Sequence, residues 1–143
     1  MKIESTAFEN NGKIPKQYTC EGEDVSPPLV IKDIPKTAKS LVLIVDDPDA
    51  PTGTFDHWLA WNIPVKETLP QNYTAPKEGR NHFGDTHYRG PCPPRGKPHR
   101  YFFKVFALDK KLDLEEGSTK FELETAMKDH VVGKAFIIGT YQR

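Results

Sequence analysis

The sequence predicts a mostly β protein that folds as a sandwich and carries one helix near its end. Its apolar segments are short, and 13 prolines and 10 glycines in 143 residues place turns between them. An apolar repeat of helical period occurs once, over residues 119–132. Because a strand with one apolar face needs a second layer to cover it, two packed sheets are the expected architecture. The length and the even composition suit a single domain over residues 1–143.

The first half of the chain supplies an edge strand and a central strand. Residues 2–7 suit an edge strand, residues 10–28 have the composition of a loop, and residues 29–31 suit a short strand. Residues 41–45 are apolar at every position. This pattern predicts a strand that is buried on both faces, in the middle of a sheet.

Further strands are expected over residues 57–63, 101–108 and 135–141. The second of these is dense in aromatic side chains. Regular alternation along residues 57–63 places four side chains on one face of that strand: His57, Leu59, Trp61 and Ile63.

The expected helix over residues 119–132 has recognisable ends. Thr119 and Glu122 fit a capping box at its start, and Gly133 is expected to end it. His130 would then lie on the apolar face of the helix and have a structural role.

Polar, proline-rich segments lie where the expected strands begin or end. Residues 47–51 read Asp-Pro-Asp-Ala-Pro, and residues 56–58 read Asp-His-Trp. The third segment, residues 90–101, contains the end of a long, proline-rich connection over residues 65–98 and the start of the next strand. Long connections inside compact domains are usually functional or disordered. Leaving a buried polar group unpaired costs about 1–3 kcal/mol, so we expect these segments to meet in one small, stiff pocket.

The side chains of this expected pocket suit an anion. His99 and Tyr101 share strand parity, and Gly90 before Pro91 lets a backbone N–H group approach a ligand closely. Together these donors suit phosphate or carboxylate. Asp47 is expected to hold a neighbouring imidazole in its protonated form, or to accept a hydrogen bond from the ligand.

The loop after Asp47 is expected to be stiff. Pro48 and Pro51 each fix φ, and the Ala50–Pro51 peptide bond is a candidate for the cis form. Arg100 points away from His99, toward the opposite face, where an ion pair with an acid is expected.

The same residues leave plainer interpretations open. Asp47 and Asp49 can cap backbone N–H groups of a turn, and His57 can be an ordinary hydrogen-bonded histidine. Two histidines and a carboxylate resemble a non-haem iron site, but the spacing matches no metal motif, so no metal or cofactor is expected. Cys92 near His99 can be weighed as a nucleophile, but nothing in the sequence lowers its pKa, and no catalytic or phosphate-loop motif is present. We therefore do not expect an enzyme.

Composition argues against several classes of partner. The 20 basic and 20 acidic side chains give no positive excess for nucleic acid, and no apolar run approaches the roughly 20 residues that span a bilayer. The first residues, with an acid at Glu4, do not resemble a signal peptide, so the cytoplasm is the expected location. In that reducing compartment Cys20 and Cys92 are expected as free thiols, with a disulfide left open.

Taken in order, these segments resemble the phosphatidylethanolamine-binding protein family, also called the Raf-kinase-inhibitor-like family, and most closely its short bacterial and archaeal branch. The resemblance covers nearly the whole chain and rests on residues 47–51, 56–58, 90–94, 99–103 and 138–141. It implies two antiparallel sheets with a Greek-key element, one or two peripheral helices, and a homodimer.

The resemblance also implies an anion pocket at one end of the sandwich. Carried over to this sequence, its ligand-binding residues are Asp47, Pro51, His57, Gly90, Pro91, His99 and Tyr101, and Asp49 braces the loop. Family members bind phosphorylated head groups, nucleotides or small anions, and some inhibit kinases or serine proteases. This sequence lacks the C-terminal extension of the animal members and has Asp56 where a histidine often occurs, which argues against phospholipid binding and Raf-type regulation here.

The expected function is therefore the binding of a small anionic or phosphorylated ligand. The alternative is inhibition of a protease or kinase, in which the loop over residues 88–98 presents Tyr88, Arg89 or Arg95. A hydrolase that uses His57 or His99 as a base is a third hypothesis, for which the sequence offers no clear nucleophile.

Overall fold

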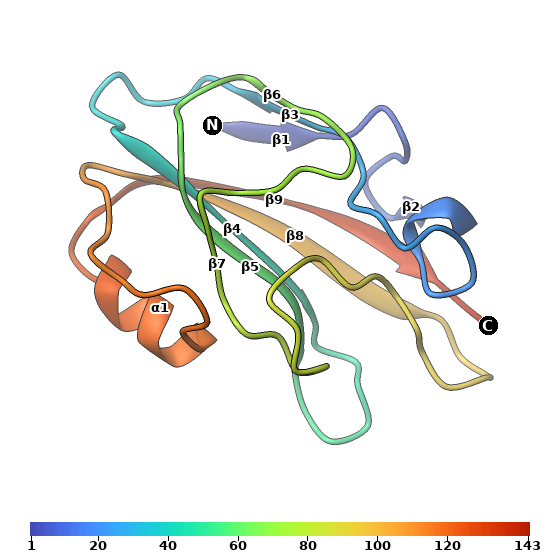
Figure 1. Ribbon diagram of the computed structural model, residues 1–143. Helices are drawn as coiled ribbons and strands as arrows, with labels where there is room; N and C mark the ends of the chain where they lie inside the picture. Colours follow the sequence, from blue (N-terminus) through green and yellow to red (C-terminus); the bar gives the residue numbers. More distant parts are fainter.

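The computed structural model describes all 143 residues and consists of two sheets and one α-helix (Figure 1). The smaller sheet has the strand order β1–β3–β6, and the larger has the order β2–β9–β8–β4–β5–β7. The strands are β1 (Lys2–Glu4), β2 (Gly12–Lys13), β3 (Leu29–Lys32), β4 (Ser40–Asp47), β5 (Phe55–Ile63), β6 (Thr68–Leu69), β7 (Lys77–Glu78), β8 (His99–Leu108) and β9 (Val131–Tyr141). The helices are the short 3₁₀ helix η1 (Lys16–Tyr18) and α1 (Lys120–Met127). The pairing of β2 with β9 is parallel, and every other pairing is antiparallel.

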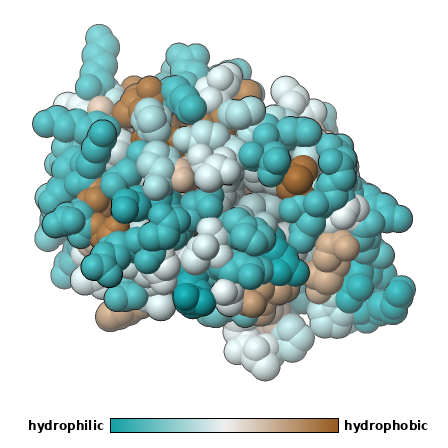
Figure 2. Space-filling model, in the orientation of Figure 1, coloured by the Kyte–Doolittle hydropathy of each residue, from teal (hydrophilic) through white to brown (hydrophobic).

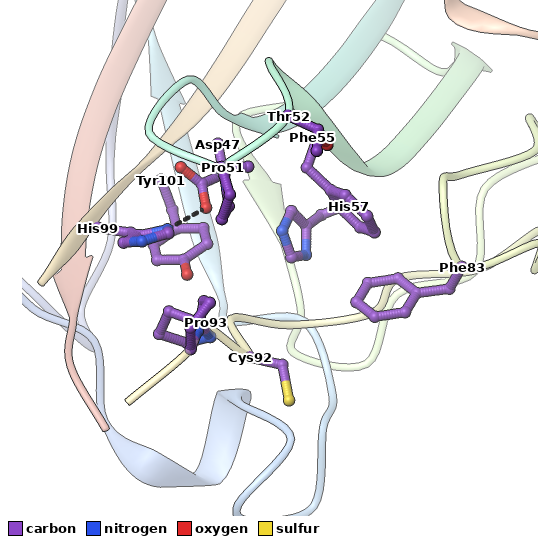
Figure 3. Close-up of a pocket in the computed structure, with 12 residues that line it drawn as sticks. Asp47, Pro51, Thr52, Phe55, His57, Phe83, Cys92, Pro93, His99 and Tyr101 are labelled. Atoms are coloured by element: carbon purple, nitrogen blue, oxygen red, sulfur yellow. Dashed lines mark hydrogen bonds and ion pairs between the residues drawn. The ribbon is translucent and has the colours of Figure 1, made fainter. Parts of the chain in front are cut away.

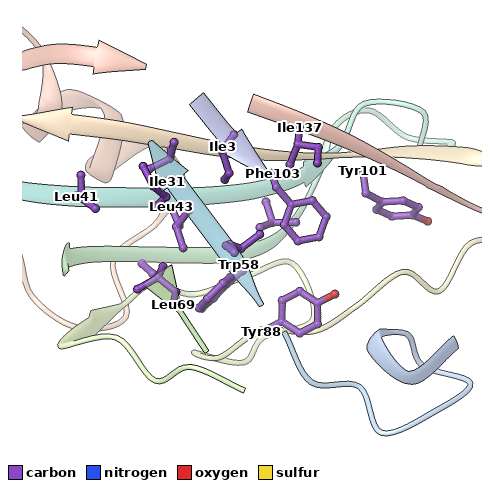
Figure 4. Close-up of a cluster of buried hydrophobic side chains, with 14 of the residues drawn as sticks. Ile3, Ile31, Leu41, Leu43, Trp58, Leu69, Tyr88, Tyr101, Phe103 and Ile137 are labelled. Carbon is purple, nitrogen blue, oxygen red and sulfur yellow. The ribbon is translucent and has the colours of Figure 1, made fainter. Parts of the chain in front are cut away.

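Strand β4 lies inside the larger sheet, as its unbroken apolar sequence predicts. It pairs with β5 on one side and with β8 on the other, and all eight of its residues are buried. Leu41 and Leu43 point into the core between the two sheets (Figure 4), whereas Val42 and Ile44 point into a second core that includes residues of α1. The larger sheet therefore has one face covered by the small sheet and the other by the segment that carries α1.

A β-bulge in β5 makes the expected alternation of its side chains wrong. The register between β4 and β5 shifts after Val45, which leaves His57 without a partner on β4. Beyond the bulge, Leu59 and Trp61 join the core under α1. After a second shift in register, between Leu41 and Leu43 on β4, Ile63 lies in the core between the two sheets. His57 faces the other side of the sheet, where its ring centroid lies 5.3 Å from that of Tyr101.

The start of α1 confirms the predicted capping box. The Thr119 hydroxyl accepts a hydrogen bond from the Glu122 N–H group at 3.3 Å, and the Glu122 carboxylate accepts one from the Thr119 N–H group at 2.9 Å. These two bonds satisfy backbone donors that the first turn of a helix leaves free.

The predicted end of this helix is wrong. α1 stops at Met127, because the chain turns at Asp129, which has a φ of +69°. Gly133 lies within β9 instead of ending the helix. His130 therefore lies off the helix, and its Nδ1 is 2.9 Å from a carboxylate oxygen of Asp109.

Cys20 and Cys92 form a disulfide, so the expectation of two free thiols is wrong. Their Cα atoms lie 5.4 Å apart although 72 positions separate them in the sequence. The bond joins the segment after η1 to the loop that precedes β8, and the Cys20 N–H group donates to the Pro91 carbonyl at 3.1 Å. Only the folded chain brings these segments together, which is why the spacing of the cysteines gave no signal.

The exposed surface in the view of Figure 2 is mostly hydrophilic, with apolar residues in separate small areas. The large apolar side chains that the protein exposes are Val65, Phe121, Val131, Val132 and Phe136. Among the helices, none has the length and apolar character required to cross a membrane.

Glu78 in β7 is a buried acid that supports the edge of the larger sheet. Its Oε1 accepts hydrogen bonds from the Trp58 indole N–H group at 3.1 Å and from the Ala75 backbone N–H group at 3.2 Å. Burial raises the pKa of Glu78 against the opposing effect of these bonds, and the Glu116 charge adds to the rise. A carboxyl group with a raised pKa favours folding most below its unfolded pKa of about 4.3, and that contribution is lost as the pH rises through the folded pKa.

We therefore expect Glu78→Gln to raise the free energy of unfolding at pH 7 by up to about 1 kcal/mol. Glutamine keeps the acceptor oxygen for Trp58 and Ala75 and removes the buried charge. Urea denaturation of both proteins at pH 4.5 and pH 7 measures the effect, and the advantage of the variant should shrink at the lower pH. A variant that is no more stable than the natural protein at pH 7 would contradict this account.

Candidate functional site

A cavity of about 300 Å³ opens at the end of the sandwich where β4 ends and where β5 and β8 begin (Figure 3). Its lining residues are Asp47, Ala50, Pro51, Thr52, Phe55, His57, Phe83, Cys92, Pro93, Pro94, His99 and Tyr101. Segments that are far apart in the sequence therefore meet at one site. Of the residues proposed from the sequence as ligand-binding, Asp47, Pro51, His57, His99 and Tyr101 line this cavity.

Asp47 and His99 form a hydrogen-bonded pair in the wall of the cavity. The Nδ1 atom of His99 lies 2.7 Å from Oδ2 of Asp47, and the Asp49 N–H group donates to the other carboxylate oxygen at 2.7 Å. The side chains of Asp47 and His99 are only 4% and 12% exposed, respectively. The carboxylate therefore fixes the orientation of the imidazole and leaves Nε2 of His99 without a partner in the protein.

His57 presents a hydrogen-bond acceptor to the cavity. Its Nδ1 lies 2.7 Å from the Arg89 carbonyl oxygen, and because a carbonyl can only accept, Nδ1 carries the proton. Burial lowers the pKa of His57, although the Arg89 carbonyl and the Asp47 charge oppose the change. In the neutral ring Nε2 is then an acceptor, and it has no partner in the protein.

Tyr101 carries the one buried side-chain polar atom of the chain that has no hydrogen-bond partner. The residue is 1% exposed, and Figure 3 shows its hydroxyl directed into the space between His57, His99 and Pro93. Burial, with the Asp47 charge, raises the pKa of Tyr101, so the phenol keeps its proton. Because leaving such a hydroxyl unpaired costs about 1–3 kcal/mol, a ligand that pairs with it gains this free energy.

Asp49 anchors the loop between β4 and β5. Its carboxylate accepts hydrogen bonds from the backbone N–H group, Nε and Nη2 of Arg100, each at 2.9 Å. Arg100 thus pairs with an acid on the side of β8 away from the cavity. All peptide bonds are trans, so the prediction of a cis bond before Pro51 is wrong.

Gly90 and Pro91 do not line the cavity, and the expected ligand contact of the Gly90 N–H group is wrong. This group donates to Asp24 at 2.7 Å, and a Cβ atom at Gly90 would lie 2.1 Å from the Tyr18 carbonyl oxygen. The glycine is required because its backbone packs against the segment of residues 18–24. The Pro91 carbonyl is likewise used there, since it accepts from Cys20.

The sequence reasoning missed the aromatic wall of the cavity. The rings of Phe55 and Phe83 lie 4.8 Å apart, and that of Phe83 lies 5.4 Å from the His57 ring. Phe55 is a near neighbour of His57 in the sequence, which was an available signal. Phe83 lies within the long connection before β8, where nothing in its sequence context indicated a role.

No lysine or arginine lines the cavity. The nearby guanidinium of Arg89 is held by Asp24, at 3.2 Å, and by Asp85. The guanidinium of Arg100 is held by Asp49. The polar side chains of the lining are therefore uncharged or acidic, apart from any protonated imidazole: Asp47, Thr52, His57, His99 and Tyr101.

This architecture defines a class: β-sandwich proteins with a small pocket, at the end of the sheets, whose polar side chains include an acid, two imidazoles and a phenol. The chain belongs to the phosphatidylethanolamine-binding protein family, whose family model matches residues 4–142.

Individual relatives agree with this assignment. The chain is 51% identical to a UPF0098 protein of Pyrococcus abyssi, over 97% of this chain and 84% of the relative. Among solved structures, a putative phosphatidylethanolamine-binding protein homologue from Chlamydia trachomatis superposes with a TM-score of 0.95 at 42% identity, covering 99% of this chain and 97% of that one. Escherichia coli YbcL, described as a member of the mammalian family, superposes with a TM-score of 0.92 at 29% identity, covering 99% and 98%.

Proposed function

We propose that this pocket binds a small oxyanion of the phosphate class and that the protein acts by binding, without turnover. The observation that carries the proposal is the buried, unpartnered hydroxyl of Tyr101, which points into the cavity. A ligand oxygen that accepts from this hydroxyl would satisfy it. The unpartnered Nε2 atoms of His57 and His99 supply two further polar contacts to the same guest.

The remainder of the lining supports a small guest with a modest substituent. The cavity volume of about 300 Å³ is at the lower end of the range for small-molecule sites. Phe55, Phe83 and Pro93 give apolar contact to whatever carries the anionic group. Binding without turnover is supported because the Cys92 sulfur is held in a disulfide and is not available as a nucleophile.

The structure does not favour the proposed protease-inhibiting loop. Tyr88 is buried, and its hydroxyl donates to the Tyr18 carbonyl at 2.8 Å. Arg89 is held by two acids, so of the three residues considered only Arg95 is exposed. We therefore do not propose inhibition as a second function.

Tyr101→Phe tests the proposal, with Tyr88→Phe as a matched control. In the natural protein, titration with phosphate should shift the NMR signals of His57 and His99. We expect Tyr101→Phe to weaken binding about tenfold without loss of stability, because its hydroxyl has no partner in the free protein. Tyr88→Phe should lower the free energy of unfolding by about 1 kcal/mol and leave binding unchanged, because it removes a buried hydrogen bond outside the cavity.

Two results would reject the proposal. One is the absence of any histidine shift at millimolar phosphate. The other is a Tyr101→Phe protein that binds phosphate as tightly as the natural protein.

A further inference from the structure

We infer that the pocket selects an oxyacid monoanion that keeps one acidic proton, such as a singly protonated phosphomonoester, over the corresponding dianion. The inference rests on the proposed function and concerns which form of the ligand the site accepts. It is carried by the hydrogen-bonding direction of His57 and by the charge of the groups around the cavity.

The bond between His57 and the Arg89 carbonyl fixes where a ligand proton is needed. Since Nδ1 must donate to that carbonyl at 2.7 Å, the neutral ring offers only the lone pair of Nε2 to the cavity. A hydroxyl on the ligand can donate to this lone pair. A fully deprotonated oxyanion would instead place oxygen lone pairs against it.

The charges around His57 also disfavour a dianion. The titratable and charged groups that face it are Asp47 from β4, His99 and Tyr101 from β8, and Asp24 and Arg89 from the loops. Arg89 is neutralised by Asp24 and Asp85. The Asp47–His99 pair carries a net charge of −1 with a neutral imidazole and 0 with a charged one, so it is positive in neither state.

No other cation in the lining changes this balance. Arg143, whose Nε donates to the Pro93 carbonyl at 2.7 Å, stands outside the lining residues. Two negative charges would therefore enter a site whose lining holds the Asp47 carboxylate and no lysine or arginine, while the Arg143 charge acts on Tyr101 only from outside the lining. This arrangement is unfavourable for a dianion. A monoanion halves that charge.

A singly protonated phosphomonoester satisfies each open group once. Its P–OH group donates to Nε2 of His57, and an anionic oxygen accepts from the Tyr101 hydroxyl. Another anionic oxygen can accept from Nε2 of His99 when that ring is charged. A phosphodiester has the same charge but lacks the proton, and sulfate lacks the proton and carries the second charge.

The test compares methyl phosphate, dimethyl phosphate and sulfate by calorimetric titration between pH 6.5 and pH 8.5. The second pKa of a phosphomonoester is about 6, so its monoanion becomes about tenfold rarer per pH unit above pH 7. We expect the association constant of methyl phosphate to fall about tenfold between pH 7 and pH 8. Dimethyl phosphate should bind at least tenfold more weakly than methyl phosphate at pH 6.5. The pH dependence of the dimethyl phosphate association constant reports any titration of the protein itself. Sulfate should be at least tenfold weaker as well.

The ¹⁵N NMR signals of His57 in the methyl phosphate complex locate the proton. At pH 8 we expect the neutral ring with its proton on Nδ1, because an imidazolium would mean that the protein and not the ligand holds the proton. His130→Gln, which changes a histidine paired with Asp109 outside the cavity, serves as the assignment control.

The outcomes separate the two proposals. Absence of binding of all three probes at millimolar concentration would reject the proposed function itself. Binding of methyl phosphate that is constant or rises from pH 7 to pH 8, sulfate binding of equal strength, or a charged His57 in the complex would overturn only the inference.

Discussion

Replacing both cysteines, in Cys20→Ser/Cys92→Ser, is expected to lower the free energy of unfolding by about 4 kcal/mol. In the chain-entropy account, the cost of losing a disulfide grows with the loop that it closes, and this one spans 72 positions. Stability is lost because the unfolded chain, no longer cross-linked, gains conformational entropy. It also releases the junction between the segment after η1 and the loop before β8.

The pocket should weaken together with the fold. Cys92 lines the cavity, and the next two residues, Pro93 and Pro94, line it as well. Without the disulfide, the segments stay linked by the hydrogen bond from the Cys20 N–H group to the Pro91 carbonyl and by that from the Gly90 N–H group to Asp24. We therefore expect phosphate binding to fall in the double variant even under conditions where it stays folded.

Urea denaturation with and without a reductant measures this effect and contains its own control. The natural protein in reductant should lose the same stability as the double variant, and the double variant should not respond to reductant at all. A loss below about 1 kcal/mol on complete reduction of the natural protein would contradict the assigned contribution.

Local signals predicted the parts of the fold that depend on neighbouring residues. The unbroken apolar run of β4 indicated a strand buried on both faces, and the structure confirms it. The capping box at Thr119 is likewise a property of one turn of chain, and it is confirmed. Strand parity correctly grouped His99 with Tyr101, because β8 pairs with β9 from His99 to Ala107 without a shift in register.

Features that depend on distant contacts could not be predicted in the same way. The bulge at His57 is defined by how β5 pairs with β4, and no residue within β5 indicates that pairing. The cavity gains Phe83 only because the long connection folds back against β5. Gly90 has the residue type of a ligand loop, but Asp24, which lies 66 positions earlier, takes its N–H group.

A buried ionic cluster on the opposite face of the larger sheet gives the second large expected effect. Lys120, the first residue of α1, contacts Asp46 at 2.7 Å and Asp56 at 3.1 Å. The side chains of these acids are only 2% and 8% exposed. Lys104 also contacts Asp46, at 2.9 Å, and His82 lies 3.7 Å from Asp56. The cluster thereby fastens the start of α1 to β4 and β5.

We expect Lys120→Met to lower the free energy of unfolding by about 3 kcal/mol. Removing one partner of a buried ion pair leaves its acids poorly compensated, which typically costs 3–5 kcal/mol, and the contact from Lys104 to Asp46 places this case at the lower end. His82 adds no positive charge, because its Nδ1 accepts a hydrogen bond from the Asp56 N–H group. Lys128→Met is the matched control, because Lys128 follows α1, is exposed and forms no ion pair, so its change should stay within about 0.5 kcal/mol.

The pH dependence of this loss separates the charge of Lys120 from its packing. Burial works to lower the pKa of Lys120, but its bonds and attraction to Asp46 and Asp56 outweigh burial and raise it. A raised lysine pKa stabilises the fold fully below the unfolded pKa of about 10.4, and this contribution is lost as the pH rises through the folded pKa. The difference between the natural protein and Lys120→Met should therefore be constant from pH 7 to pH 9 and shrink as the pH rises above the unfolded pKa of about 10.4.

A second substitution identifies the cause of the loss. Adding Asp56→Asn to Lys120→Met removes one of the poorly compensated charges, so the double variant should recover part of the stability that Lys120→Met loses. If the double variant were less stable than Lys120→Met alone, the loss would come from packing of the lysine stem and not from unpaired charge. If Lys120→Met were as stable as Lys128→Met, the cluster would not hold α1 to the sheet.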